Sequence, residues 1–411
     1  MLYSLPLPLD KIEELYNYRL ALRKFSRYGS KAQLRLMIDN IAQVEALQAW
    51  AEENMTSAAQ QQDCFSVFIK CESGNRRAGV HPESAYLRQL LSTIKERCPI
   101  VSVYGFYAHA GNSYASTSSA AAQVKLSEEI ATVNKAAIVA KGILFDQTVA
   151  GTVDGSRHEQ PFVLSVGSTP TAHAAHDVVQ AKAALANLEG GKVELHAGNY
   201  PFLDLQQLAT KAIPTRASDH TGNELVPDCC DDELKVQQSV SNVAFTVLST
   251  VIADYPGRAS GPTDAETGAP RGDGAWSADG RAKHGDEAMC DAGGIALSRD
   301  VGPFGGLGHI VWPKDKFGWE INRASQEHGL LSVRQGGPEQ WAKQWQHEKS
   351  SDGEEGQQQY PTRVYLGERI QIIPQHSCLT AAQFPWYYVV DSRDTSGGQV
   401  VRDVWVPWKF W

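Results

Sequence analysis

The stretch FVLSVGSTPTAHAAHDVVQAKAALANL (162–188) sets the pattern for the first half of the chain. Its opening residues, 162–167, form an apolar run typical of a buried strand, and residues 174–188 have the spacing of an amphipathic helix. A strand that leads directly into a helix is one βα unit of a parallel sheet. The same order recurs through the first half, which predicts an α/β architecture there.

Further strands and helices alternate along the same half of the chain. We predict strands at 2–5, 33–39, 64–70, 100–108 and 192–200, and helices at 11–25, 41–53, 84–97 and 121–142. Most strand centres are about 31 residues apart, close to one unit of a (β/α)8 barrel, but we count roughly six units where a closed barrel needs eight. Either the sheet is not a closed barrel, or two units are missing from its front.

The pattern changes from about residue 240, where short β-like runs are separated by turn signals. These runs lie at 245–256, 288–298, 309–312, 363–366, 369–374, 386–391 and 400–408. Nine of the ten tryptophans lie beyond residue 239. We therefore predict two domains, an incomplete (β/α)8 barrel over 1–238 and an all-β domain over 239–411. Residues 258–286, rich in Gly, Ala, Asp and Pro, and residues 334–359, rich in Gln and Glu, are predicted to be inserted mobile loops.

Composition narrows the class of protein. The 411 residues carry a formal net charge of −9 and no long basic run, so a nucleic-acid partner is not expected. No apolar stretch reaches about 18 residues, and the first residues do not form a secretory signal, so we expect no membrane association. Seven cysteines, an odd number without an export signal, indicate reduced thiols and a cytoplasmic location.

The most distinctive local element is RIQIIPQHSCLTAAQF (369–384), in which His376 and Cys378 are two residues apart. If the backbone stays extended there, both side chains point to one face. An imidazole nitrogen and a thiolate sulfur together suit Zn²⁺, and two protein ligands leave coordination positions for water or substrate. On spacing alone, a lone buried histidine and a lone core cysteine remain the alternative.

Two strand ends have the composition of a phosphate site. LSVGSTPT (164–171) offers Ser168 and Thr169 just before a helix, and ELHAGNYPFLD (194–204) offers Gly198, Asn199 and Tyr200. Late neighbouring strands of a barrel commonly share one phosphate site at their C-terminal ends. Each stretch could equally be an ordinary capping turn or a tight left-handed turn.

Two earlier strand ends carry further polar groups. IKCESGNRRAGV (69–80) places Lys70 and Arg77 after a strand, where an arginine could bind an anionic oxygen. YGFYAHAGNSY (104–114) places Tyr107, His109 and Tyr114 at another strand end. The alternatives are a solvated basic loop in the first case and packing of core and loop in the second.

Taken in order, these motifs resemble one family. The same resemblance includes FTVLSTVIADYPGR (245–258), PQHSCLTAAQFPWYYVV (374–390) and the closing DVWVPWKFW (403–411), so that it covers nearly the whole chain except the two insertions. The chain resembles the eukaryotic, fungal-type D-serine dehydratases, which are related to D-threonine aldolase and more remotely to alanine racemase.

The resemblance implies a pyridoxal 5'-phosphate enzyme of fold type III, a (β/α)8 barrel with a C-terminal β domain, usually a homodimer. It implies that Ser168, Thr169, Gly198 and Asn199 hold the cofactor phosphate, that Arg77, Tyr107, His109, Tyr114 and Tyr200 surround the ring and substrate, and that His376 and Cys378 bind zinc. The aldolase relatives carry a carboxylate at the position of Cys378, so a thiol there favours the dehydratase.

The implied reaction is β-elimination. The amine of D-serine would form a Schiff base with the cofactor, which would act as electron sink when the Cα proton is removed. Zinc would coordinate the β-hydroxyl and help it leave as hydroxide. The aminoacrylate released would hydrolyse to pyruvate and ammonia.

One departure from the family concerns the Schiff-base lysine, which the resemblance places on the first barrel strand in a His-Val-Lys-Thr-His-Lys type segment. No such segment is present, and the chain begins at what resembles the third strand, in agreement with the count of units. We expect a truncated reading frame of a genuine enzyme. The alternatives are a shortened inactive paralogue that retains metal binding, and an activity of the D-threonine aldolase type.

Overall fold

The computed structural model describes residues 1–56, 63–145, 161–175, 188–212, 243–258, 266, 276–335 and 360–407. The chain divides into two compact units, each described by itself below. The first comprises Met1–Ala197 and Ala212–Pro214, and the second comprises Gly198–Lys211 and Thr215–Trp411. The predicted boundary between 238 and 239 lies outside the described residues and stays a prediction. Most of both predicted insertions, 259–265, 267–275 and 336–359, also lies outside them.

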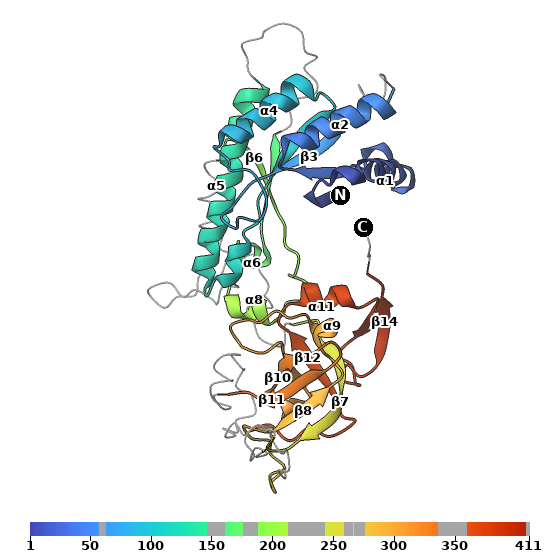
Figure 1. Ribbon diagram of the computed structural model, residues 1–411, viewed down its shortest axis with the longest axis vertical. Coiled ribbons are helices and arrows are strands. Elements are labelled where there is room, and N and C mark those ends of the chain that lie inside the picture. Colours follow the sequence, from blue (N-terminus) through green and yellow to red (C-terminus); the bar gives the residue numbers. More distant parts are fainter. Residues whose placement is uncertain are drawn as a thin grey trace. The chain divides into compact units, whose positions relative to one another are not determined.

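The first unit is built on a six-stranded sheet in which each strand pairs in parallel with the next (Figure 1). The strands are β1 (Leu2–Pro6), β2 (Arg35–Ile38), β3 (Phe65–Lys70), β4 (Val101–Tyr107), β5 (Phe162–Val166) and β6 (Gly191–Leu195). All six predicted strands are confirmed. The sheet order runs from β1 to β6 without closing, so the prediction of a partial barrel is confirmed as well.

Helices alternate with these strands as predicted. They are α1 (Ile12–Phe25), α2 (Ile41–Asn54), α4 (Ala85–Arg97), α5 (Ser119–Leu144) and α6 (Thr169–Ala174), with short 3-10 turns η1 (Leu9–Lys11), η2 (Gly29–Lys31) and η3 (Gly111–Ala115). Side-chain caps fix several starts, because a cap satisfies amide groups that have no partner inside the helix. Asn40 caps α2 in a capping box, and Ser118 caps α5. Of the predicted helix 174–188, residues 176–187 lie outside the described residues.

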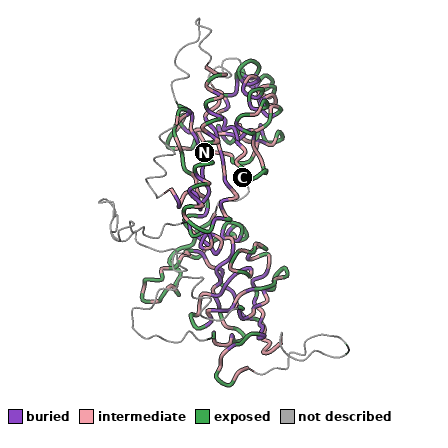
Figure 2. The backbone as a smooth tube through the Cα atoms, turned by 90° about the vertical axis from the view of Figure 1, so that its left-hand side faces the viewer, coloured by how far each residue is buried: buried purple, intermediate pink, exposed green. Residues whose placement is uncertain are grey.

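The core of the first unit lies between the sheet and helices α2, α4 and α5 (Figures 1 and 2). Leu47, Leu90 and Val133, one from each helix, are fully buried together with strand residues such as Val67 and Leu164. Burial of this apolar surface is the main favourable term in folding. This core contains the apolar side chains of the strands, and the polar groups described below lie at the C-terminal strand ends and in the loops that follow them.

The second unit is a closed six-stranded antiparallel barrel in the order β10-β11-β8-β7-β12-β9. Its strands are β7 (Val247–Tyr255), β8 (Glu287–Cys290), β9 (Gly308–Trp312), β10 (Trp319–Ala324), β11 (Gly329–Val333) and β12 (Arg369–Pro374), and a separate two-stranded sheet joins β13 (Tyr387–Val390) to β14 (Val401–Trp405). The helical elements are α8 (Leu205–Thr210), α9 (Gly294–Leu297), η6 (Lys314–Lys316) and α11 (Ser377–Gln383). The expected C-terminal β domain is confirmed. Among the described helices, none has the length and apolar character needed to cross a membrane.

Two predicted β runs were wrong in detail. The run 288–298 begins in β8 but continues as the helical turn α9. The run 363–366 is not a strand, because it follows a single isolated bridge from Thr362 to Arg281 and leads into a turn in which Glu368 N donates to the Tyr365 carbonyl. Strands β10 and β11 were not predicted; the charged residues of β10 interrupt any plain apolar pattern.

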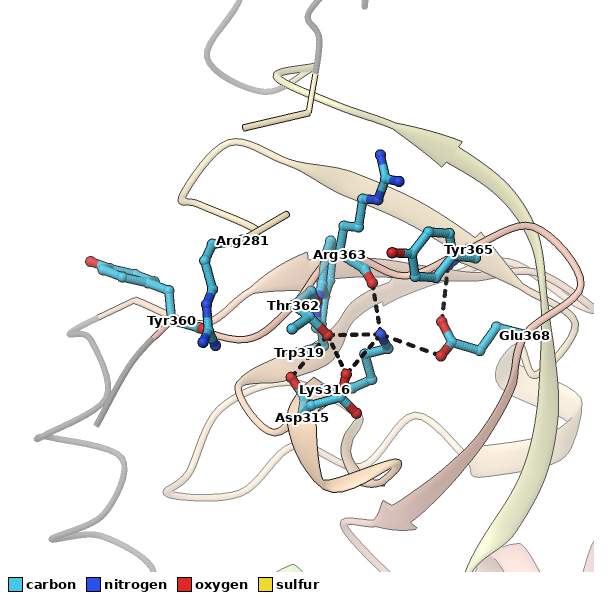
Figure 3. Close-up of polar contacts among 9 residues, drawn as sticks. All are labelled: Arg281, Asp315, Lys316, Trp319, Tyr360, Thr362, Arg363, Tyr365 and Glu368. Atoms are coloured by element: carbon cyan, nitrogen blue, oxygen red, sulfur yellow. Dashed lines mark hydrogen bonds and ion pairs between the residues drawn. The ribbon is translucent and has the colours of Figure 1, made fainter. Parts of the chain in front are cut away.

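A buried lysine fastens the segment before β12 to this barrel (Figure 3). The Lys316 side chain is only 3% exposed, and its Nζ donates to Thr362 Oγ1 at 2.7 Å and to the Arg363 carbonyl at 2.8 Å. The Glu368 carboxylate lies 3.3 Å away, and Asp315 lies 3.1 Å away. A buried ammonium is tolerated only when its donors are paired in this way.

We predict that Lys316→Met lowers the free energy of unfolding by about 2 kcal/mol, because the paired carbonyl, hydroxyl and carboxylate lose their donor. Denaturation followed by tryptophan fluorescence measures the change, since nine of the ten tryptophans belong to the second unit. The matched control is Lys283→Met at an exposed side chain. Equal stability of the two variants would contradict the assigned role.

Candidate active site

Polar side chains gather where strands of the first unit end. Because the C-terminal ends of parallel strands meet at one edge of a sheet, the loops that follow them can share a site. His109, after β4, is hydrogen-bonded through Nδ1 to the Gly167 carbonyl after β5 at 2.9 Å. The hydroxyls of Ser113 and Ser168 are 2.7 Å apart. The loops after β4 and β5 are therefore joined by two hydrogen bonds, one from a side chain to the backbone and one between two side chains.

Ser168 and Thr169 lie at the start of α6, and both are buried. Ser168 caps the helix in a capping box with Thr171. Gly167, just before them, has φ +138°, and a Cβ there would lie 2.1 Å from the His196 carbonyl oxygen. Only glycine fits such a position, so the close approach of the β5 and β6 ends depends on it.

An aromatic stack crosses the same edge. The rings of Tyr107 and His196 lie 4.3 Å apart at 9°, and the ring of His109 is 6.1 Å from that of His196. Tyr114 lies 6.4 Å from His109. Burial raises the pKa of Tyr107 to about 12 and lowers the pKa of His196 to about 4. At neutral pH the Tyr107 phenol is protonated and the His196 imidazole is neutral, and each can exchange hydrogen bonds with a ligand.

The basic residues predicted after β3 are placed differently from one another. Lys70 is buried, and its Nζ donates to the Cys71 carbonyl at 2.7 Å. Burial lowers the pKa of Lys70. Arg77 is exposed, in a loop that Glu72 organises by accepting backbone N–H groups from 74–76. Burial lowers the pKa of His109, and the positive charge of Arg77 contributes to the same shift.

A buried carboxylate that the sequence did not single out supports these loops. Glu129 of α5 is fully buried and accepts hydrogen bonds from Ala110 N at 2.5 Å, Gly167 N at 3.3 Å and Thr171 Oγ1 at 3.0 Å. Burial raises its pKa to about 7. His196 was also missed, although it lies inside the quoted ELHAGNY motif. The position of His196 at a strand end could have marked it as a candidate site residue. Glu129 lies within a helix, where nothing in the neighbouring sequence marks it as one.

In the second unit, His376 and Cys378 lie at the start of α11, and the backbone does not stay extended there. His376 is extended (φ −138°, ψ 98°) and precedes the helix, but the helix begins at Ser377, so Cys378 is in its first turn. The turn forms because Thr380 N donates to the His376 carbonyl and Ser377 N to the Asp204 carboxylate. The condition for the two side chains to share one face of a strand is therefore not met.

The two side chains have different surroundings. His376 Nδ1 is hydrogen-bonded to Asp300 Oδ2 at 2.6 Å, which fixes the orientation of the ring. Cys378 is exposed at the surface, although partial desolvation of its sulfur and the Asp204 carboxylate raise its thiol pKa to about 11. Within the described ranges, no three His, Cys, Asp or Glu residues are grouped so that they could hold a metal ion.

The stretch Gly198–Tyr200 belongs to the second unit. Asn199 is buried, and its Nδ2 donates to Asp204 Oδ2. Gly198 and Tyr200 are exposed. Through Asp204, Asn199 is brought into one hydrogen-bonded cluster with the segment that carries His376 and Cys378.

Comparison with known proteins gives the family. Residues 279–390 match the domain described as "Putative serine dehydratase domain", and residues 20–144 match "Alanine racemase, N-terminal domain". The D-serine dehydratase of Schizosaccharomyces pombe is 34% identical over the whole of this chain and 74% of its own length. The chain belongs to the D-serine dehydratase family. The enzyme of that name from Saccharomyces cerevisiae is 29% identical over the same shares of the two chains. The chain thus spans about three quarters of the length of these relatives.

Solved structures show the same alanine racemase-like fold. The D-threo-3-hydroxyaspartate dehydratase from Delftia sp. HT23 covers 100% of this chain and 79% of its own, with a TM-score of 0.58 and 25% identity. Other solved forms of that enzyme replace a histidine, or a cysteine two positions later, by alanine, and the cysteine variant is described as metal-free. The D-threonine aldolase from Filomicrobium marinum covers 97% of this chain and 73% of its own, at a TM-score of 0.53 and 16% identity, and shares the fold. The family consists of pyridoxal-phosphate enzymes of fold type III.

We predict that Glu129 makes stability depend on pH. Since its folded pKa of about 7 lies above the ordinary value of 4.5, the folded state retains a proton that the unfolded state releases, and stability falls as pH rises from 4.5 to 7. The fall is at most about 3 kcal/mol. Glu129→Gln is expected to remove it.

Denaturation of both proteins across this range measures the effect. The lowered pKa of His196 gives a slope of opposite sign, present in both proteins, so the difference between them isolates Glu129. A difference that stays constant with pH would show that Glu129 does not titrate in this range.

Proposed function

We propose that this chain forms the pyridoxal-phosphate-binding and zinc-binding body of a D-serine dehydratase, which eliminates the β-hydroxyl of D-serine and yields pyruvate and ammonia. The observation that carries the proposal is the start of α11, where the Asp300-oriented imidazole of His376 and the thiol of Cys378 lie two residues apart in a chain of this family. We further propose a cytoplasmic homodimer, which agrees with the free thiols of all five cysteines in the described residues.

The donors present fit zinc. A neutral imidazole nitrogen and a thiolate sulfur are ligands of the borderline-soft ion, and metal binding lowers the pKa of a coordinating thiol. The carboxylate on His376 Nδ1 is the usual outer partner of a metal-bound histidine, and it holds the ring in the required tautomer. With two protein ligands, the remaining positions would be filled by water and by the substrate hydroxyl. When bound, zinc would act as a Lewis acid that stabilises the departing hydroxide.

The strand ends fit pyridoxal phosphate. His196 Nε2 is buried and has no hydrogen-bond partner among the described residues. The His196 ring is stacked on Tyr107, so this nitrogen could bond to a polar atom of the cofactor ring. We propose that Ser168, Thr169, Gly198 and Asn199 hold the phosphate and that Arg77, Tyr107, His109, Tyr114 and Tyr200 surround the ring and substrate. The cofactor would supply the electron sink for the carbanion.

The residues of this chain would position and shield the reactants. The half-buried imidazole of His109 is fixed on the Gly167 carbonyl through Nδ1, so its Nε2 could accept one proton and later return it without movement of the ring. The Tyr107 phenol stays protonated at neutral pH, so it can form hydrogen bonds with a neighbouring polar atom but cannot act as a base. The buried hydroxyls of Ser168 and Thr169 lie at a helix start, where the partial positive charge favours an anion.

We predict that replacing either metal ligand abolishes function. His376→Ala and Cys378→Ala are expected to lose bound zinc and to release pyruvate from D-serine at least about 100-fold more slowly, because the leaving hydroxide loses its Lewis acid. Zinc is measured by elemental analysis and pyruvate by a coupled assay. The matched controls are His328→Ala, an exposed histidine, and Cys64→Ala, a half-buried thiol of the first unit.

Several outcomes would overturn this proposal. Turnover of D-serine that persists in a strong chelator would remove the zinc role. Glycine and acetaldehyde from D-threonine, without pyruvate from D-serine, would make the protein an aldolase. Zinc binding without either reaction would make it a metal-binding paralogue.

A further inference from the structure

A second buried carboxylate, Asp204, connects three segments of the second unit. It is fully buried just before α8. Its Oδ1 accepts the Gln207 N–H at 2.8 Å and caps the helix. Its Oδ2 accepts the Ser377 N–H at 2.8 Å and also the Asn199 side-chain N–H. One side chain therefore holds the Asn199 loop, the start of α8 and the start of α11.

Ser377, which Asp204 holds, stands between the two proposed zinc ligands. It is fully buried, and its hydroxyl donates to the Leu203 carbonyl at 2.6 Å. With both its N–H and its hydroxyl bound, the backbone at Ser377 has little freedom. The directions in which His376 and Cys378 leave that backbone are then set by Asp204 and its neighbour.

Asp204 also fixes the other proposed site. Asn199 is only 2% exposed, and its amide nitrogen points to the same Oδ2 atom that accepts from Ser377. A carboxylate oxygen has lone pairs for two donors, whereas an amide has only one accepting oxygen. No neutral side chain of the same size could hold both segments and cap α8 as well.

We propose that Asp204 is a positioning residue of the second unit that holds both Asn199, for the cofactor phosphate, and the start of α11, for zinc. The inference rests on the proposed function, and it adds that the phosphate and metal sites depend on the same buried carboxylate. Groups that orient metal ligands typically contribute 10- to 100-fold in metal affinity, roughly the size expected here.

The test is the affinity of the full chain for Zn²⁺ and, separately, for pyridoxal phosphate. Asp204→Asn leaves at least one N–H donor facing an amide nitrogen. We expect zinc to bind roughly 10- to 100-fold more weakly and pyridoxal phosphate about fivefold more weakly. Competition with a coloured chelator measures zinc, and equilibrium dialysis measures the cofactor.

The second unit offers a matched control. Asp286 is also buried, at 2% exposure, and accepts two backbone N–H groups, from Gly257 at 2.6 Å and Lys283 at 2.8 Å. Asp286→Asn should lower thermal stability as Asp204→Asn does, with both affinities unchanged. The absorption of Co²⁺ bound in place of zinc gives a second readout, since it changes with ligand geometry and is unaffected by a mere loss of stability.

A second variant keeps the inference testable if Asp204→Asn does not fold. Asp204→Ser keeps a hydroxyl that can cap α8 but is too short to reach Ser377 as well. The bond from Gln206 N to the Gln375 carbonyl still joins the two segments, so this variant is expected to fold. Circular dichroism checks the fold, and the same two affinities are measured.

The possible results separate the inference from the proposed function. Full zinc affinity in both Asp204 variants, or loss of zinc affinity with the cofactor affinity unchanged, would overturn the shared role of Asp204 alone. Equal losses in Asp286→Asn would also overturn it. Absence of zinc binding by the unsubstituted chain would overturn the proposed metal role, and this inference with it.

Discussion

A buried carboxylate surrounded by hydrogen-bond donors is the interaction on which both units depend at their polar ends. Glu129 binds the loops after β4 and β5, and Asp204 binds the starts of α8 and α11 to Asn199. Removing a carboxylate from water costs several kcal/mol unless hydrogen bonds replace its hydration. Each carboxylate here accepts three such bonds. The loops that these carboxylates join are not strands of a sheet. The hydrogen bonds to the carboxylates therefore hold the loops together, as backbone hydrogen bonds hold neighbouring strands.

Most of the scaffold could be predicted from sequence because it follows local patterns. Apolar runs and helical spacing gave all six strands of the first unit, and turn signals gave most of the barrel. The failures have long-range causes. Strand β10 carries Glu320 and Arg323, which obscure its alternation, and Glu320 is stabilised by Arg334 from beyond β11. Residues 363–366 have strand composition, but the Arg363 carbonyl accepts from Lys316 Nζ, and the Tyr365 ring lies 5.1 Å from the same ammonium.

The site was predictable only where its residues lie at strand ends within a motif. Ser168, Thr169, Tyr107 and His109 could be placed in that way, and the structure gathers them at one edge of the sheet. The backbone at His376 could not be anticipated, because the helix that starts after it depends on a hydrogen bond to a residue 173 positions earlier. Glu129, Asp204 and Asp300 were missed for the same reason: their partners are close only in the folded chain.

The proposed function depends most on the zinc ion that one imidazole and one thiolate would hold at the start of α11, with Asp300 hydrogen-bonded to the imidazole. X-ray absorption at the zinc edge of the purified, zinc-loaded chain reports these ligands directly. We predict one sulfur at about 2.3 Å and nitrogen or oxygen ligands at about 2.0–2.1 Å. A shell of oxygen and nitrogen alone, or a sulfur signal that persists in Cys378→Ala, would contradict the account.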